Sequence, residues 1–305
     1  MNHKGKTIRL FLVDGVASGI LTAEIMNWTG KVLVVPRTQL AGLAGRPEAK
    51  RTGIYCLIGP DPQKQSEDRV YIGEGDNVLN RLAAHDRDES KDFWNRAVVV
   101  TSKDENLTKS HGRFLESRLI QIARVEGRAQ VDNSTSPPLP SLPEPDVADM
   151  EQFIEQVRLI FPVLGYRFLQ ARPVPAVVDG GSGVATGDSP VFVCELVGTK
   201  ARAQEIEGEF VVFKGSTARR QGVASWTSYR ALREQLVQGG KLVESDDPDY
   251  FVFDEDVPFS SPSAGAAVVI ARNANGRIQW KVEKTQQTYQ AWSEQRLEPS
   301  RNQTS

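Results

Sequence analysis

Cysteine and histidine are scarce in this chain, which has two cysteines and three histidines among its 305 residues. Cys56 and Cys194 stand far apart in the sequence, and two thiols do not make the disulfide framework that stabilises small secreted domains. The histidines show no metal-ligand spacing with one another or with the cysteines, so the sequence encodes no zinc knuckle. A disulfide-rich protein and a zinc-finger protein are both excluded.

Long apolar runs are also missing. The longest, such as residues 264–271, are far shorter than the ~20 residues that a membrane-spanning helix needs. Residues 8–13 are apolar apart from Arg9, but Asp14 and Gly15 follow them without a small-residue cleavage signature, which favours a strand over a signal peptide. We therefore expect no membrane partner and, as the default, a cytoplasmic location.

The sequence has no excess of positive charge either, since 37 Lys and Arg residues face 39 Asp and Glu, for a net charge of -2. Bulk electrostatics therefore give no support to nucleic-acid binding, and any basic footprint has to be local. Two clusters qualify, and each is equally typical of a solvated surface: Arg46 with Lys50 and Arg51, and Lys214 with Arg219 and Arg220.

The chain is long enough for about two ordinary domains. Residues 136–146 are rich in proline, which predicts a stiff, extended linker and the clearest domain boundary. The sequence predicts an N-terminal β/α extension, a first domain, the linker, a helix with a hinge, an α+β domain and a polar tail, in that order. Their ranges are 1–50, 51–135, 136–146, 147–189, 190–283 and 284–305.

Hydrophobic periodicity and turn residues locate the secondary structure. Before the linker we expect strands at 7–13, 32–35, 53–58, 69–73 and 97–101, and helices at 19–28, 77–86 and 108–126. Asp76 is the expected cap of the helix at 77–86. After the linker we expect helices at 147–161, 227–238 and 261–271, and strands at 190–197, 209–213, 241–244, 250–253 and 278–282.

Two tripeptides, Gly53-Ile54-Tyr55 and Tyr71-Ile72-Gly73, lie on neighbouring predicted strands, and Arg81 and Glu116 lie on the two helices predicted further along. Residues 51–135 thereby resemble the GIY-YIG nuclease family. One tripeptide alone is a weak signal, but two on one hairpin with Arg and Glu following are much more specific. The resemblance implies a small three-stranded antiparallel sheet flanked by helices, in an α+β protein with a separate C-terminal mixed α+β domain. It also implies cleavage of DNA phosphodiester bonds.

The resemblance implies a role for each residue of the set. Glu116 would hold one divalent cation, Mg²⁺ or Mn²⁺, and Arg81 would stabilise the charge that develops on the phosphate. Tyr55 would be the general base or would position the attacking water, with Tyr71 and His85 assisting. The chemistry is sound, because strands of period two can project both tyrosines from one face and a guanidinium grips phosphate oxygens. A single carboxylate suits Mg²⁺, which keeps several waters.

Three further points accompany this resemblance. Asn133 matches the polar residue after the family's Glu-bearing helix, and it is equally a turn former before the prolines. An unperturbed tyrosine has a pKa of about 10, so either Arg81 and a cation lower the pKa of Tyr55 or Tyr55 passes its proton through a metal-bound hydroxide, and the sequence does not choose between the two. The loop at 59–69 is longer and more polar than the usual family hairpin, which costs little because loop closure depends weakly on length.

The C-terminal part carries a second resemblance, to a domain of unknown function found at the C-termini of some GIY-YIG nucleases and restriction-modification subunits. The residues that carry it are 208–219, 259–267 and 280–282. Ser261 followed by proline predicts a helix N-terminus, which would bind phosphate if basic residues lay beside it. The predicted nucleic-acid-binding set is Lys214, Ser216, Arg219 and Arg220. Small residues here are equally consistent with tight packing.

Three hypotheses follow. In the first, residues 51–135 cut DNA while the C-terminal domain holds DNA or a protein partner, in repair, restriction or defence against foreign DNA. In the second, the chain is a non-catalytic DNA-binding or regulatory module that retains the nuclease fold. The third is a protein-interaction scaffold, suggested by the acidic net charge and the linker.

Overall fold

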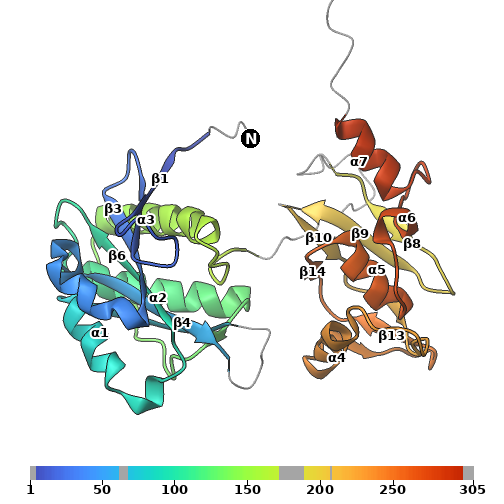
Figure 1. Ribbon diagram of the computed structural model, residues 1–305, viewed down its shortest axis with the longest axis horizontal. Coiled ribbons are helices and arrows are strands. Elements are labelled where there is room, and N and C mark those ends of the chain that lie inside the picture. The colour runs from blue at the N-terminus through green and yellow to red at the C-terminus, as the bar shows by residue number, and fades with distance from the viewer. Residues whose placement is uncertain (1–4, 62–67, 172–188, 207, 298–305) are drawn as a thin grey trace, which may run out of the picture. The chain divides into compact units, whose positions relative to one another are not determined.

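The computed structural model describes residues 5–61, 68–171, 189–206 and 208–297 (Figure 1). The chain forms two compact units, Met1–Ala171 and Arg172–Ser305. The division therefore falls after Ala171 and not at the proline-rich residues 136–146, because the helix that follows the prolines packs into the core of the first unit. Most of the hinge expected before residue 190 lies outside the described residues.

A seven-stranded sheet organises the N-terminal unit, in the order β1-β2-β3-β6-β4-β5-β7. All neighbours are antiparallel except β5 and β7, which are parallel. The strands are β1 (Ile8–Leu12), β2 (Leu21–Ile25), β3 (Gly30–Pro36), β4 (Gly53–Pro60), β5 (Asp68–Gly75), β6 (Arg96–Ser102) and β7 (Gln130–Val131).

The small, self-contained three-stranded sheet that we expected is not what the structure contains. The strands bearing the tripeptides, β4 and β5, do pair with β6, but β3 continues the same sheet along the whole of β6. The helix expected at 19–28 is wrong, because Leu21–Ile25 is strand β2 and hydrogen-bonds to both β1 and β3. Pairing on both sides outweighs the weak helical preference of its alanine and glutamate.

The helices of this unit are α1 (Val78–Asp86), α2 (Lys109–Glu126) and α3 (Glu144–Val163), with short 3-10 helices η1 (Arg37–Gly45), η2 (Pro47–Lys50) and η3 (Glu89–Lys91). Asn77, and not Asp76, caps α1 by accepting a hydrogen bond from the backbone of Asn80 at 3.1 Å. Local signals set the ends of α2, since the Thr108 side chain caps its start and Gly127 ends it in a left-handed conformation.

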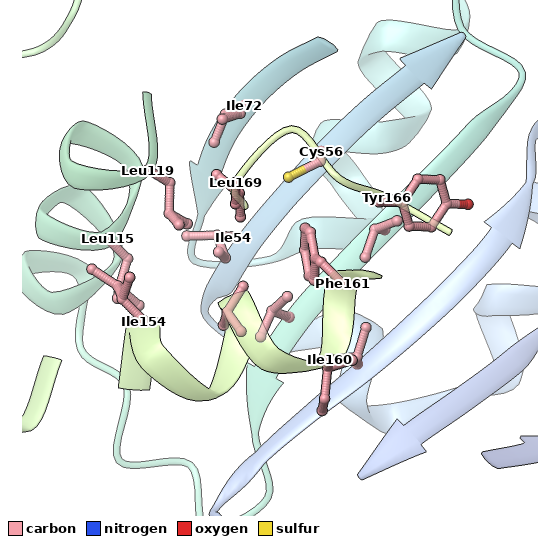
Figure 2. Packing of buried hydrophobic residues seen from close by; sticks show 14 of the residues in the cluster. Ile54, Cys56, Ile72, Leu115, Leu119, Ile154, Ile160, Phe161, Tyr166 and Leu169 are labelled. Carbon is pink, nitrogen blue, oxygen red and sulfur yellow. The ribbon is translucent and has the colours of Figure 1, made fainter. Parts of the chain in front are cut away.

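The two faces of the sheet are buried under different helices. Figure 2 shows side chains of α2 and α3 packed on the face to which Ile54, Cys56 and Ile72 contribute. Tyr55 and Leu57 belong to the opposite cluster, which includes α1 and η1. This alternation follows from the period of two along a strand. Both cysteines, Cys56 and Cys194, are buried free thiols, as their spacing predicts.

The C-terminal unit contains a five-stranded antiparallel sheet, β14-β10-β9-β8-β15, and a three-stranded antiparallel sheet, β11-β13-β12. The first consists of β8 (Phe192–Cys194), β9 (Ala201–Ile206), β10 (Glu209–Val212), β14 (Val257–Phe259) and β15 (Lys281–Val282). The second consists of β11 (Thr217–Arg219), β12 (Leu242–Glu244) and β13 (Tyr250–Phe253). The helices are α4 (Arg230–Gln238), α5 (Pro262–Ile270), α6 (Gly276–Gln279) and α7 (Tyr289–Leu297).

Two expectations for this unit need correction. The strand expected at 278–282 is the end of α6 followed by the two-residue strand β15. Residues 289–297 of the expected polar tail form helix α7, because Tyr289 and Trp292 pack their rings on Phe192 at centroid distances of 5.2 and 5.1 Å. Over the ranges that the structure describes, no helix has the length and apolar character needed to cross a bilayer.

Replacing Phe161 by Ala is expected to lower the free energy of unfolding of the N-terminal unit by about 3–5 kcal/mol. Phe161 is fully buried on α3, and its ring lies 5.7 Å from that of Phe168. Urea unfolding measures the change, and Val163→Ala is the control because Val163 is 56% exposed on the same helix. Wild-type stability in Phe161→Ala would show that α3 is not part of this core.

Candidate active site

The two tyrosines of the tripeptides lie on one face of the hairpin. The β4–β5 register pairs Tyr55 with Gly73 and Leu57 with Tyr71, which makes Tyr55 and Tyr71 diagonal neighbours. Their ring centroids are 6.3 Å apart. The strand pairing thus brings together the two phenols as the sequence predicted.

Two glycines on β5 make room for this arrangement. A Cβ atom on Gly73 would lie 2.4 Å from the hydroxyl oxygen of Tyr55, so only glycine lets the phenol cross the strand here. A Cβ on Gly75 would lie 2.6 Å from Cγ of Arg81, whose stem covers that position. The glycine of the second tripeptide is therefore a packing requirement of the tyrosine in the first.

His85 contacts the Tyr55 hydroxyl directly. The distance from the Tyr55 hydroxyl oxygen to Nε2 of His85 is 2.8 Å, and the His85 ring packs edge-on against Tyr71. Burial lowers the pKa of His85, and the positive charges of Arg81 and Lys91 lower it further. The imidazole is therefore neutral at pH 7, and in the tautomer that carries its proton on Nδ1 the Nε2 atom accepts the phenolic hydrogen bond.

Burial also decides the protonation of Tyr55. It raises the pKa of this fully buried phenol, and the neighbouring Tyr71 adds to the increase. Arg81 acts in the expected direction, through its charge and a hydrogen bond, but its effect is smaller than that of burial. Without a cation, Tyr55 is therefore a protonated phenol at neutral pH, contrary to the lowered pKa that a base acting alone requires.

Glu116 reaches the same region from α2. Burial is the main reason why its pKa is raised to about 7, and the negative charge of Glu74 contributes next. Arg81 opposes the increase, and the charge of Glu116 in turn raises the pKa of Tyr55 and of Tyr71. Tyr55 thus contacts His85 and Arg81 directly, Tyr71 packs on His85, and Glu116 lies close enough for its charge to act on both tyrosines and on Arg81.

Glu74 is a member of this group that the sequence analysis missed. It follows Gly73 and therefore points to the other face of β5, where its Oε2 lies 3.5 Å from the position of a Cβ on Gly112. Gly112 is one helical turn before Glu116. Oε2 of Glu74 is buried and has no hydrogen-bond partner. Its position directly after the second tripeptide could have marked Glu74 as a candidate site residue. Strand alternation alone, however, does not show which helix the side chain faces.

Asn133 holds the edge of β5. The β5–β7 ladder pairs Arg69 with Gln130 and Val70 with Val131, and at Ile72 the side-chain amide of Asn133 continues it. Its Oδ1 accepts from the Ile72 N–H at 2.9 Å, and its Nδ2 donates to the Ile72 carbonyl at 2.7 Å. Asn133 is 8% exposed and engages the backbone between Tyr71 and Gly73, so its geometry is that of a positioning residue.

Asp132, the neighbour of Asn133, ties down the same edge. Its carboxylate accepts a hydrogen bond from Nε of Arg69 at 2.8 Å and forms a second ion pair with Lys91. The Nζ atom of Lys91 lies 4.2 Å from the centroid of the Tyr71 ring. Lys91 and Asp132 are residues that no sequence pattern indicated.

Glu116 and Glu74 are the carboxylates of this site that could be metal ligands. Among the residues that the structure describes, no group of three or more His, Cys, Asp or Glu side chains could hold a metal ion. A zinc site usually takes three or four such side chains, whereas Mg²⁺ commonly takes one or two carboxylates and keeps several waters. Glu116, with the unpartnered Oε2 of Glu74 lying against Gly112 in the preceding turn of α2, fits Mg²⁺ or Mn²⁺.

The predicted phosphate site of the C-terminal unit is not formed as expected. Ser261 does cap α5, but Arg219 lies near the other end of that helix, because Arg233 donates to the carbonyls of both Arg219 and Val268. A helix C-terminus carries partial negative charge, which does not attract phosphate.

The other members of that predicted set are engaged elsewhere. The hydroxyl of Ser216, which is 4% exposed, accepts from the N–H of Arg202 at 3.1 Å and donates to its carbonyl at 3.3 Å. Lys214 is exposed and lies 3.4 Å from Asp254, while Arg220 pairs with Glu244 at 2.6 Å.

Comparison with known proteins bears on the C-terminal unit. The family described as "Domain of unknown function (DUF4357)" matches residues 192–293, a range that includes most of α7. The expected likeness of this part to a domain of unknown function is thereby confirmed, and the match does not extend to the tyrosine tripeptides. No curated protein and no solved structure matches the chain significantly.

In the metal-free protein, the Glu116 carboxyl is expected to titrate near pH 7, since its pKa is raised to about 7. Because this pKa exceeds the ordinary value, Glu116 stabilises the folded state at acidic pH, and the contribution is lost as the pH rises towards 7. Carbon-detected NMR of the glutamate carboxyls measures the titration. Glu74→Gln is expected to lower the Glu116 pKa, whereas Glu155→Gln, exposed on α3, is expected to leave it unchanged. An unaltered titration in Glu74→Gln would disprove the coupling.

Asn133→Leu is expected to destabilise the N-terminal unit by about 1–3 kcal/mol, because it leaves the Ile72 N–H and carbonyl unpaired. Urea unfolding measures the loss, with Asn80→Leu as the control on the exposed face of α1. If Asn133→Leu kept wild-type stability, the amide would not be the positioning group that its hydrogen bonds indicate.

Proposed function

We propose that the N-terminal unit is an endonuclease that hydrolyses DNA phosphodiester bonds with one Mg²⁺ or Mn²⁺ ion. The observation that carries the proposal is the hydrogen bond between Tyr55 and a neutral His85, with Arg81 beside it and Glu116 within range of both tyrosines. The resemblance of residues 51–135 to the GIY-YIG nuclease family supports the same reaction.

The raised pKa of Tyr55 calls for a proton relay. As the attacking water gives a proton to the Tyr55 oxygen, Tyr55 gives its own proton to Nε2 of His85, which is 2.8 Å away. Tyr55 is a protonated phenol before and after the step, and the His85 imidazole becomes an imidazolium. The hydroxide forms a bond to phosphorus while the bond between phosphorus and the leaving oxygen breaks, and that oxygen leaves as an oxyanion. Because no free phenolate forms, the raised pKa of the buried Tyr55 is compatible with its role in this relay.

The remaining residues bind and position. The guanidinium of Arg81 is held across Gly75 next to Tyr55, where it can donate two hydrogen bonds to non-bridging phosphate oxygens. Glu116 would hold the cation, with Glu74 as its nearest carboxylate neighbour. A bound Mg²⁺ ion would neutralise charge on the phosphate. Asn133 fixes the strand that carries Tyr71.

Within the proposal, the C-terminal unit holds DNA or a protein partner and so raises the effective concentration of the target for the cutting unit. Repair, restriction and defence against foreign DNA are processes that need such a tethered cutter. A cytoplasmic location belongs to the same proposal.

Nicking of supercoiled plasmid is the test. The wild-type protein is expected to nick with Mg²⁺ or Mn²⁺ and to stop when a chelator removes the metal. Tyr55→Phe and Glu116→Ala are each expected to slow nicking at least ~100-fold, the scale of losing a general base or its electrostatic support. His85→Ala removes only the relay's acceptor, so a loss of at least ~10-fold is expected.

The matched control is Glu155→Ala, an exposed glutamate on α3 of the same unit, which should nick at the wild-type rate. Metal-dependent nicking that survives Glu116→Ala would indicate a contaminant or a different site. DNA binding without any nicking would favour the second hypothesis, a non-catalytic module.

A further inference from the structure

The C-terminal unit contains a cavity that the proposed nuclease site does not use. It lies between α4, β13 and the loop that precedes α4, and its volume is about 550 Å³. Cavities of roughly 300–1,000 Å³ are the usual size for small-ligand sites. Its lining includes three arginines and two aromatic residues, namely Arg220, Arg230, Arg233, Trp226 and Phe251.

Arg233 gives the cavity wall a buried positive charge. Its side chain comes from α4, the residue is 5% exposed, and its guanidinium donates to the carbonyls of Val268 at 2.7 Å and Arg220 at 3.1 Å, and also to that of Arg219. These partners are neutral carbonyls, and among the described residues no carboxylate forms an ion pair with Arg233. Burial lowers the pKa of Arg233 to about 10, which leaves it charged at neutral pH.

The arginines are interleaved with flat aromatic rings. The Arg233 guanidinium lies 5.5 Å from the centroid of the Trp226 ring and 5.3 Å from that of Phe251. Arg220 lies 5.4 Å from the centroid of Phe251 on the same wall. Arginines next to aromatic faces are the combination that proteins use to stack nucleobases while holding the phosphate.

Two arginines at the rim are available to a phosphate. Arg220 pairs with Glu244 and Arg230 pairs with Glu234, and their side chains are 39% and 64% exposed. Exposed ion pairs of this kind contribute little, so exchanging a glutamate for a phosphate costs little. The cavity therefore combines the fixed positive charge of Arg233 inside it with two arginines at its rim, Arg220 and Arg230, that can exchange a glutamate for a phosphate.

We propose that this cavity binds one nucleotide of single-stranded DNA, with the phosphate at Arg220 and Arg230 and the base against Phe251 and Trp226. A single strand fits better than a duplex, because the bases of a duplex are stacked on each other and cannot turn onto a protein ring inside a cavity. The inference rests on the C-terminal unit alone and does not require the N-terminal unit to cut.

The first test is the affinity of the full chain for a labelled 12-nucleotide single strand, measured by fluorescence anisotropy with a chelator present so that nothing is cut. Arg220→Gln with Arg230→Gln is expected to weaken binding at least ~10-fold. It should also reduce the slope of log affinity against log salt by about 0.7, since the two arginines share one phosphate and each phosphate neutralised on a single strand contributes about 0.7. Arg233 is left intact because it holds three backbone carbonyls.

The matched control is Arg202→Gln with Arg277→Gln. These two arginines are also exposed and ion-paired in the C-terminal unit, with Glu283 and Glu294, but they do not line the cavity. The control is expected to bind within twofold of wild type. Equal affinity of the Arg220/Arg230 variant and wild type, or an equal loss in the control, would overturn the proposal.

The second test locates the ligand through the indole N–H resonance of Trp226, which donates to the Ser228 carbonyl at 2.6 Å and is assigned with Trp226→Phe. The single strand is expected to shift this resonance, and deoxyadenosine 5′-monophosphate should do so only at much higher concentration. A mononucleotide that binds as tightly as the strand would assign the cavity to free nucleotides and overturn the strand assignment. An equal shift with duplex, or none with any probe, would also overturn it.

Discussion

The pairing of Tyr55 with Gly73 across β4 and β5 is the constraint on which the N-terminal site depends. Because Gly73 has no side chain, the Tyr55 ring can cross its strand and place the hydroxyl 2.8 Å from Nε2 of His85. Two residues on, Gly75 leaves the corresponding space for the stem of Arg81. The period of two along β5 puts Gly73 and Gly75 on one face, so the phenol of Tyr55 and the guanidinium of Arg81 lie side by side over that face. Asn133 preserves that alignment by bonding the backbone of Ile72.

Burial then sets the protonation states that this geometry needs. It raises the pKa of Tyr55 and of Glu116 and lowers that of His85, so each group is biased towards its neutral form. A neutral imidazole beside a protonated phenol is a donor–acceptor pair ready for proton transfer. In the proposed metal complex Glu116 would have to be ionised, so binding of the ion would be coupled to loss of a proton.

The C-terminal unit is built around a different buried charge. Arg233 joins α4 to the carbonyls of β11 and α5, which are uncharged partners. Breaking those contacts would leave three carbonyls unpaired, so the charge is fixed by the fold as well as available to a ligand. The N-terminal unit instead surrounds its arginine with phenols and carboxylates. The arginine of the N-terminal site therefore lies among acidic groups, whereas Arg233 of the C-terminal unit is bonded to neutral carbonyls.

The sequence by itself determined the elements whose signals are local. The two tripeptides lie on paired strands, the helix at Lys109–Glu126 runs between a Thr cap and a Gly stop, and Ser261 caps α5. These follow from side-chain period and capping chemistry, which involve only neighbours along the chain. Only the tertiary structure decided that residues 21–25 are a strand, that the prolines do not divide the units, and that Glu74 faces α2. Each of those depends on which distant segment supplies hydrogen bonds, apolar contacts or charge, and a local pattern does not contain that information.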